Sequence, residues 1–587
     1  MSDFKLALLF FLSLIALSVN AQQADGHALE EFFKASGSPV NPKVQISWNR
    51  YHTNEGLLDI YLKMAKTYPE LVRLESIGKS HEGRDLWLLT ITNHSNKPHH
   101  EKPGFWIDGN IHANEIQAAE VSLYTAWYLV ENYHSNDFIT QLLDEKAFYI
   151  LPVMNPDGRE NYMNKPNTAN APRSGTMPLD DDGDGVVGED GFDDLNGDGH
   201  ITQMRRQNPF GLYREDPDDA RRLIRVKQGE FGEWELLGYE GYDRDVDGRI
   251  NEDRDVGYYD HNRDWGWNWQ PDYVQRGAYH YPFSLPETRA VRDFVLAHPN
   301  ISGALTHHNT GGMFLRGPGV EQDQEYYLRD DLRVYDALGQ MGEKLVPGYN
   351  YLVSYKDLYT VYGGQRDWFH LMRGAYTFTV ELFSRYLLFH EKPLRRSRGF
   401  SDDYYTFDKH LLFEDAFVPW EEYFHPQFGK IQIGGFKKNY IRVHPGFMLE
   451  QDAHRIMAFS LYHAYHTPQL EITELKSKDL GGGQFEVTAV ITNTRMIPTH
   501  SSINLEYHID PPNYVEIIGP KVLAGMIVID EDLNIVEEQL TNPEKLEVEN
   551  ISGMSIATVR WIIDGKENIG VLLNSVKGGK YSKVFED

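Results

Sequence analysis

The sequence predicts an α/β region followed by a separate all-β region. From Tyr51 to about His466, short apolar runs alternate with helical patterns, which is typical of a sheet covered by helices on both faces. From Gln469 onward, polar and apolar residues alternate between Gly and Pro turns, which favours a β-sandwich-like domain. The two patterns predict two different architectures in one chain of 587 residues.

The elements of the α/β region follow from its apolar spacing. A helical pattern begins near Tyr51 and ends before Pro69. Strands are expected at 86–91, 105–107 and 147–151, with a helix over 115–133 between the last two. Further strands are expected at 302–305 and 376–382, and in the all-β region at 484–492, 502–508 and 555–563.

Composition shifts divide the chain into segments. Residues 172–257 are rich in Asp and Gly and have little apolar periodicity, so they are expected to form an acidic insertion. The predicted organisation is a signal peptide over 1–21, a lead-in segment over 22–44, an α/β region over 45–467 that contains the insertion, and an all-β region over 468–587.

The N-terminal residues carry the features of a signal peptide. Lys5 precedes an apolar run over 6–17, which is about twelve residues and shorter than the ~20 that span a membrane. Val19, Asn20 and Ala21 offer small residues for cleavage. A membrane anchor is the alternative. No other apolar segment is long enough to span a membrane, so the mature chain is expected to be exported.

Charge and cysteine content exclude several classes of function. The chain has 57 basic and 87 acidic residues, a net charge of −30, which repels nucleic-acid phosphates. It has no cysteine, which excludes disulfides, thiolate zinc sites and cysteine nucleophiles. An exported chain of this size without disulfides fits a bacterial periplasm or extracellular space better than an animal secretory route.

One short motif carries the ligand types of a metal site. His112 and Glu115 are three residues apart where a predicted strand meets a predicted helix, so both side chains can face one point. Imidazole and carboxylate groups are zinc ligands at ~2.0–2.2 Å. A catalytic zinc needs a third protein ligand and keeps one position open for water. A His and a Glu at this spacing are common on surfaces, so the motif needs support from elsewhere in the chain.

Other motifs supply that support. In chain order, the motifs lie at 77–84 (IGKSHEGR), 108–115 (DGNIHANE), 155–158 (NPDG), 260–265 (DHNRDW), 306–312 (THHNTGG), 359–368 (YTVYGGQRDW) and 376–382 (YTFTVEL). Together they resemble the zinc carboxypeptidase family, which includes carboxypeptidases A and B, over roughly residues 45–435. The resemblance implies an α/β/α sandwich with a mixed, twisted sheet, one zinc ion, and hydrolysis of the C-terminal peptide bond of peptides.

The resemblance also implies roles for single residues. It assigns the zinc ligands to His112, Glu115 and His308, and the general base to Glu381. It assigns a carbonyl-polarising role to Arg205, a clamp on the terminal carboxylate to Asn262 and Arg263, a mobile closing role to Tyr359, and an outer subsite to Arg84. Two of these assignments have an alternative. His307, next to His308, could be the third zinc ligand, and Arg206, next to Arg205, could polarise the carbonyl.

By the resemblance, Arg366 lies at the position that recognises the terminal side chain of the substrate in this family. An arginine there suits an acidic terminal residue by charge complementarity. The alternative is that Arg366 forms an ion pair with a nearby acid and does not select the terminal side chain of the substrate.

Three segments of the insertion resemble calcium loops, because acids at alternate positions before a Gly turn can surround one hard cation with oxygen ligands. The glutamate usual at position twelve is absent, and Asp190 and Asp253 stand one position earlier. A solvated acidic loop is the alternative. The candidate calcium ligands are Asp180, Asp182, Asp184 and Asp190; Asp194, Asn196 and Asp198; and Asp243, Asp245, Asp247 and Asp253.

Two other functions compete with the carboxypeptidase hypothesis. One is a zinc amidase that acts on peptidoglycan stem peptides or on acylated amino acids; the presence of Asn262, Arg263 and Tyr359 favours peptides instead. The other is a non-catalytic cell-surface binding protein, against which the complete ligand set and Glu381 argue.

Overall fold

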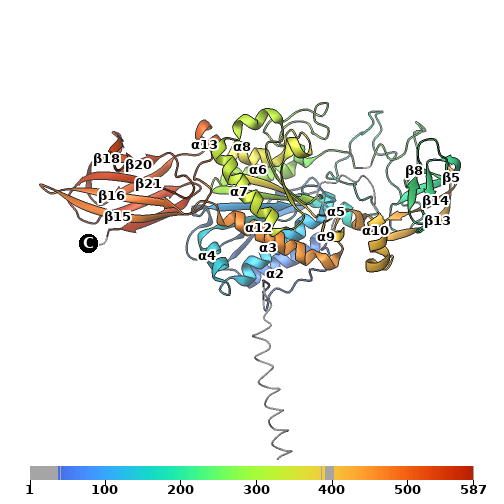
Figure 1. The fold of residues 1–587 in the computed structure, drawn as a ribbon, viewed down its shortest axis with the longest axis horizontal. Helices are drawn as coiled ribbons and strands as arrows, with labels where there is room; N and C mark the ends of the chain where they lie inside the picture. The colour runs from blue at the N-terminus through green and yellow to red at the C-terminus, as the bar shows by residue number, and fades with distance from the viewer. Residues whose placement is uncertain (1–36, 40, 255, 385, 390–401, 586–587) are drawn as a thin grey trace, which may run out of the picture.

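The computed structural model describes residues 37–39, 41–254, 256–384, 386–389 and 402–585. The predicted signal peptide and residues 22–36 of the predicted lead-in lie outside them. Figure 1 shows a central α/β body with a β-sheet region beyond each side, one of them ending at the C-terminus. Within the described part of the chain, no helix is long and apolar enough to cross a membrane.

The central body is built on one eight-stranded mixed sheet. Its strand order is β1-β2-β4-β3-β9-β12-β10-β11. The neighbours β4, β3, β9 and β12 run parallel to one another, and the outer pairs β1–β2, β2–β4 and β10–β12 are antiparallel. The strands are β1 (Val72–Lys79), β2 (Asp85–Ile91), β3 (Gly104–Gly109), β4 (Ala147–Leu151), β9 (Ile301–Asn309), β10 (Met313–Arg316), β11 (Asn350–Val353) and β12 (Tyr376–Leu382).

Helices cover both faces of this sheet. Successive strand residues point to opposite faces, so Phe105 and Ile107 join one core while Trp106 joins the other. The first core receives apolar residues from α2 (Asn54–Thr67), α3 (Ile116–Asn132), α4 (Asp137–Glu145), α7 (Arg329–Leu345) and α12 (Leu449–Tyr465). The second is covered mainly by α6 (Pro286–Ala297) and α8 (Gln365–Arg373). The predicted α/β class, with helices on both faces of a mixed sheet, is confirmed.

The acidic insertion contributes to a second sheet of its own. Four of its strands join a later hairpin in a six-stranded antiparallel sheet of order β13-β14-β5-β8-β6-β7. This sheet lies beyond the central body at the right of Figure 1. Its strands are β5 (Gln203–Gly211), β6 (Tyr213–Glu215), β7 (Leu223–Arg225), β8 (Gly232–Tyr239), β13 (Phe417–His425) and β14 (Gly429–Phe436).

The C-terminal region consists of two antiparallel sheets that share one core, as the predicted β-domain requires. Val487 of one sheet and Val515 of the other both belong to this core, with Trp561 fully buried. The five-stranded sheet has the order β15-β16-β21-β18-β19 and the four-stranded sheet β20-β17-β22-β23. The strands are β15 (Leu470–Gly481), β16 (Gln484–Asn493), β17 (Asn513–Ile518), β18 (Lys521–Asp530), β19 (Ile535–Glu538), β20 (Lys545–Val548), β21 (Ser555–Asp564), β22 (Gly570–Ser575) and β23 (Gly579–Val584).

One predicted strand is wrong. Residues 502–508 do not extend a sheet but form the short helix α13 (Ser502–Tyr507). Ile503 is buried in the core of the central body, and the Asp331 carboxylate of α7 accepts a hydrogen bond from Ser502 N at 3.1 Å. A carboxylate at a helix N-terminus is stabilising. This contact comes from 171 residues away, so a six-residue alternating pattern could not reveal it.

The remaining helices are short. The first part of the central body also carries α5 (Pro156–Asn164), which the Asn155 side chain caps by accepting a hydrogen bond from Gly158 N. The others are α9 (Tyr386–Phe389), α10 (Asp402–Phe407) and α11 (Lys438–Arg442).

Candidate metal centre

The candidate zinc ligands meet at the carboxyl edge of the parallel strands. His112 lies in the loop after β3, Glu115 is the N-cap residue of α3, and His308 is the penultimate residue of β9. Because β3 and β9 are parallel neighbours, their carboxyl ends open at the same edge, where ligands of α/β sheets usually bind. Asn110, with a positive φ of 56°, turns the chain there and donates to the His112 carbonyl at 2.6 Å.

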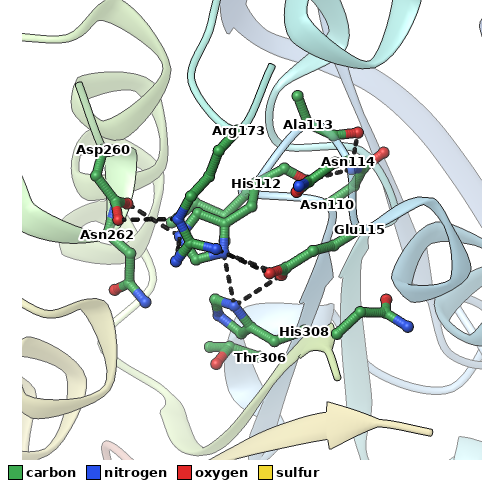
Figure 2. Close-up of polar contacts among 12 residues, drawn as sticks. Asn110, His112, Ala113, Asn114, Glu115, Arg173, Asp260, Asn262, Thr306 and His308 are labelled. Atoms are coloured by element: carbon green, nitrogen blue, oxygen red, sulfur yellow. Dashed lines mark hydrogen bonds and ion pairs between the residues drawn. The ribbon is translucent and has the colours of Figure 1, made fainter. Parts of the chain in front are cut away.

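Three potential ligand atoms converge on one point. Glu115 Oε2 lies 3.0 Å from His112 Nδ1 and 3.0 Å from His308 Nδ1, and the two imidazole nitrogens are 3.1 Å apart (Figure 2). Ligands bound at ~2.0–2.1 Å around a tetrahedral zinc lie roughly 3.3 Å apart. The spacing and the donor types therefore fit zinc closely.

A second layer of side chains orients these ligands. Asp260 Oδ1 lies 2.9 Å from His112 Nε2, the carboxylate–histidine pairing that is common at zinc sites. The other oxygen of Glu115, Oε1, accepts hydrogen bonds from Arg173 at 3.1 Å and Arg442 at 2.9 Å. Two arginines thus hold Oε1, while Oε2 faces both histidines. Among the described residues, Glu115 Oε2 receives no well-aligned hydrogen bond, which suits a metal ligand.

The two adjacent histidines of β9 point in opposite directions. His307 Nδ1 lies 3.0 Å from the Ser122 hydroxyl of α3, on the face of the first core. Burial lowers the pKa of His307 to about 3, so its ring stays neutral. The structure brings His308, and not His307, to His112 and Glu115.

Glu381 lies beside the converging ligands. It is the penultimate residue of β12 and pairs in register with His308 on the parallel neighbour β9. Burial raises the pKa of Glu381 to about 7; the Glu115 carboxylate adds to the rise, and the His308 ring opposes it. A carboxyl with a pKa near neutrality can both accept and release a proton.

The structure does not bring Arg205 to this group, which corrects the sequence prediction. Arg205 lies on β5 in the second sheet, where its guanidinium carbon is 3.9 Å from the ring centroid of Trp234 and 4.2 Å from that of Trp420. It also pairs with Glu215 at 2.8 Å. Its neighbour Arg206 pairs with Glu235 on the same sheet. Both arginines are structural parts of the second sheet.

Arg173 lies beside the converging ligands, where Arg205 was expected from the sequence. Its guanidinium contacts Glu115 Oε1 at 3.1 Å, Asp260 Oδ2 at 3.3 Å and His112 Nε2 at 2.8 Å (Figure 2). Its side chain keeps 21% exposure and lines the cavity in front of the ligands. A cation in this position can stabilise negative charge that develops on a carbonyl oxygen.

Four of the five predicted substrate-binding residues line the same cavity. Arg263 is buried, and its Nε has no hydrogen-bond partner among the described residues, so donors remain available to a ligand. Asn262 Oδ1 accepts from Gln365 N at 2.9 Å, which fixes the side chain. Tyr359 is 48% exposed at the cavity wall. The lining includes His112, Arg173, Asn262, Arg263, His308, Tyr359, Arg366 and Glu381.

Two other predicted substrate residues differ in position. Arg366, near the start of α8, lines the cavity and forms an ion pair with Asp367 at 3.4 Å. Arg84 does not line it. It pairs with Asp157 at 2.7 Å and borders a separate hollow beside Trp87.

The acidic loops of the insertion also lie outside this cavity. In the second loop, Asp194 accepts from Asp198 N at 3.1 Å and from Gly199 N at 2.9 Å, so the loop closes on itself with Asn196 at its tip. The other two loops contact each other. Several of their acids lie close enough together to share a metal ion. These acids include Asp180, Asp182, Asp184 and Asp190 of the first loop and Asp243, Asp245, Asp247 and Asp253 of the third.

A family model described as zinc carboxypeptidase matches residues 58–194 and 238–395, about half of the chain. The chain belongs to the zinc carboxypeptidase family. The family resemblance that the sequence motifs indicated is confirmed. A second family model, described as a domain of unknown function, matches residues 469–586.

Individual relatives match shorter stretches. Carboxypeptidase D of Rattus norvegicus is 33% identical over 143 residues, 24% of this chain and 10% of the relative. Zinc carboxypeptidase of Saccharothrix mutabilis subsp. capreolus is 34% identical over 110 residues, 19% of this chain and 25% of the relative. The chain therefore spans only a tenth to a quarter of these relatives. The solved carboxypeptidase A from Helicoverpa armigera is 19% identical, with a TM-score of 0.42, over 75% of this chain and 80% of that chain.

Sequence reasoning missed three residues of this zinc carboxypeptidase site: Arg173, Asp260 and Arg442. Asp260 lay within a recognised motif, two residues before Asn262, but it had no assigned role. Arg173 is the second residue of the predicted insertion, and its signal was its place soon after the 155–158 motif. Arg442 reaches Glu115 from 327 residues away, and no local pattern marks it.

Proposed function

We propose that the chain is a zinc-dependent metallocarboxypeptidase that removes the C-terminal residue of peptides. The observation that carries this proposal is the convergence of His112, Glu115 and His308 within 3.1 Å, beside Glu381 and in the same cavity as Arg263. One zinc ion per chain would be held by the three converging side chains. The predicted catalytic region over 45–467 contains all these residues.

Each residue has a defined task in the proposed reaction. When bound, zinc lowers the pKa of a coordinated water toward ~7 and polarises the scissile carbonyl. Glu381 accepts a proton from the attacking water and then delivers it to the leaving amine. Arg173, in place of Arg205, donates hydrogen bonds to the carbonyl oxygen as negative charge develops on it.

The cavity explains why cleavage would occur at the chain end. Arg263 offers a planar fork that can bind the terminal carboxylate through two parallel hydrogen bonds. Asn262 adds a fixed amide beside it. Holding the terminus places the last peptide bond at the reacting groups, and Tyr359 at the cavity wall can close over the bound residue. Arg84 keeps its proposed place at an outer subsite, away from the cavity itself.

A zinc amidase acting on peptidoglycan stem peptides or acylated amino acids is the second candidate, and a non-catalytic surface protein is the third. The presence of Asn262, Arg263 and Tyr359 in one cavity favours a free peptide carboxylate over other amides. Glu381 beside the ligands favours catalysis over binding alone. Hydrolysis of muropeptides but not of linear peptides would favour the amidase.

Arg366 is proposed to select an acidic terminal residue. Its guanidinium lines the cavity, and its partner Asp367 also accepts from Gly319 N at 2.8 Å and from the Tyr327 hydroxyl at 3.2 Å. Asp367 is thus shared among three donors, and its contact with Arg366 is long at 3.4 Å, so the guanidinium can also donate to a substrate carboxylate. The alternative, in which Asp367 neutralises Arg366, predicts no charge preference.

We expect Arg366→Gln to lower kcat/KM for peptides ending in Glu by roughly tenfold or more, since a charged hydrogen bond contributes about 1.5–3 kcal/mol. The same variant should change kcat/KM little for peptides ending in Ala. The measurement is kcat/KM for two peptides that differ only in the last residue. Equal losses on both peptides would show that Arg366 supports the cavity without reading the terminal side chain.

The choice between the adjacent histidines gives a direct test of the metal site. We expect His308→Ala to lose bound zinc, because one of three protein ligands is removed, while His307→Asn keeps about one zinc per chain. Metal content after dialysis against trace zinc measures both, with circular dichroism as the check on folding. Zinc retained by folded His308→Ala would contradict the proposed ligand set.

Two further proposals concern the whole protein. We propose that the chain is exported, to a bacterial periplasm or to the extracellular space, on the basis of the signal pattern at residues 1–21. We also propose calcium as a second, structural cofactor of the acidic insertion, separate from the peptidase reaction.

A further inference from the structure

The first acidic loop (180–190) and the third acidic loop (243–253) exchange their last acids. Asp253, the eleventh residue of the third loop, accepts from Asp181 N of the first loop at 3.0 Å. Asp190, the eleventh residue of the first loop, accepts from Arg244 N of the third loop at 2.5 Å. Both N–H groups belong to the second residue of their loop. The two loops are therefore related by an approximate two-fold exchange, whereas the sequence predicted that each loop would use its own eleventh residue.

Among the described residues, the acids of these two loops form four groups, and two of the groups contain an exchanged eleventh residue. One oxygen each of Asp180, Asp182 and Asp253 lies within 4.8 Å of the others. The same holds for Asp190, Asp245 and Glu252. Each of these two groups combines acids of one loop with an acid from the partner loop, as ligands shared around one ion would.

The second group contains a buried oxygen that receives no hydrogen bond from the described residues. Asp190 is only 1% exposed, and its Oδ2 receives no hydrogen bond from the described residues. The Glu252 carboxylate beside it also lacks a donor among these residues. Burial raises the pKa of Glu252, and the nearby Asp190 adds to the rise. A buried carboxylate oxygen without a donor beside a second, half-buried carboxylate is unfavourable unless a cation neutralises the pair.

We propose that the two acidic loops bind two Ca²⁺ ions as a pair, with Asp253 completing the site of the first loop and Asp190 completing the site of the third loop. The donors are all oxygens, several of them carboxylates on flexible, Gly-containing loops, which suits calcium better than the smaller and more rigidly octahedral magnesium. A site without nitrogen or sulfur donors is also distinct from the zinc centre.

The paired loops connect directly to the catalytic cavity. Asp181 accepts from Tyr258 N at 2.8 Å, Ser174 donates to the Gly257 carbonyl at 2.9 Å, and the Tyr259 hydroxyl accepts from Met177 N at 3.1 Å. These bonds join the two arms of the insertion into a stem. One arm begins at Arg173 and the other ends at Asp260, so cation binding would fix both residues at the zinc ligands. This link rests on the proposed function, but the calcium sites themselves do not.

A double-variant calorimetric experiment tests the exchange. Calcium is titrated into the full chain after chelator treatment and dialysis, with zinc absent from the titrant. We expect Asp190→Asn and Asp245→Asn to weaken calcium binding at the same site, each by roughly tenfold or more. The double variant should leave calcium binding at the other site unchanged. Asp190→Asn with Asp180→Asn should weaken both sites. The exposed control Glu233→Gln, which removes the same charge from β8, should leave binding unchanged.

The proposal would be overturned if the wild-type chain bound no calcium. It would also be overturned if Asp190→Asn weakened the same calcium site as Asp180→Asn and not the site weakened by Asp245→Asn. Limited trypsin digestion gives a second readout, because Arg244 and Arg249 are exposed in the third loop. Calcium should slow cleavage there in the wild type and not in Asp190→Asn/Asp180→Asn. No readout here uses substrate, so a failed calcium proposal is distinguishable from a failed peptidase proposal.

Discussion

Glu381→Gln is expected to lower kcat/KM for C-terminal hydrolysis by roughly 10²- to 10⁴-fold, the contribution typical of a positioned general base. Glutamine keeps the size of the side chain but cannot accept the proton of the attacking water. Zinc content should stay at about one per chain, because none of the three converging ligands is altered. Steady-state kinetics on a peptide ending in Glu, together with metal analysis, measures both quantities.

A matched substitution separates this effect from general damage. Glu450→Gln removes the same charge from an exposed position of α12 and should leave kcat/KM unchanged. If Glu381→Gln kept near wild-type activity with zinc bound, another group would have to be the base, and Glu381 would be a buried structural acid.

Arg173→Met is expected to lower kcat/KM by roughly 10²- to 10³-fold, the range observed when one oxyanion donor is removed. The loss should appear mainly in kcat, because the donor acts on charge that develops only in the transition state. Arg173 also contacts Glu115 and Asp260, so zinc content must be measured alongside kinetics. Loss of activity with zinc retained would support the proposed role.

Arg205→Met is the informative comparison for this prediction. Arg205 stacks between Trp234 and Trp420 in the second sheet, so its loss should lower thermal stability while kcat/KM of the folded enzyme stays near wild type. The opposite pattern, with Arg205→Met inactive and Arg173→Met active, would restore the role predicted from sequence.

The convergence of the proposed ligands and Glu381 could be expected from the sequence because the signals for it are local. His112 and Glu115 lie in one strand-to-helix connection, and the ends of adjacent parallel strands necessarily meet at one edge of the sheet. His308 and Glu381 follow from that rule once the strands are recognised. The choice of His308 over His307 depended on the family resemblance, and the alternation of side chains along β9 gives the same result.

The sequence failed where distant segments decide the structure. Arg173 and Arg205 both lie within the predicted insertion, which separates the motifs at 155–158 and 260–265, so the sequence alone favoured the wrong arginine. Residues 502–508 alternate like a strand, but contacts with Asp331 and the central core make them a helix. The exchange of Asp190 and Asp253 between two loops also depends on tertiary contact, which the spacing within each loop cannot reveal.

The most direct test of the central claim is product analysis on one peptide prepared with a free and with an amidated C-terminus. The zinc-loaded chain should release single residues from the free C-terminus, and it should leave the amidated peptide intact because Arg263 has no carboxylate to bind. Removal of zinc should abolish release, and its return should restore it. Cleavage of both peptides at internal bonds, or bound zinc without cleavage of either, would contradict the carboxypeptidase proposal.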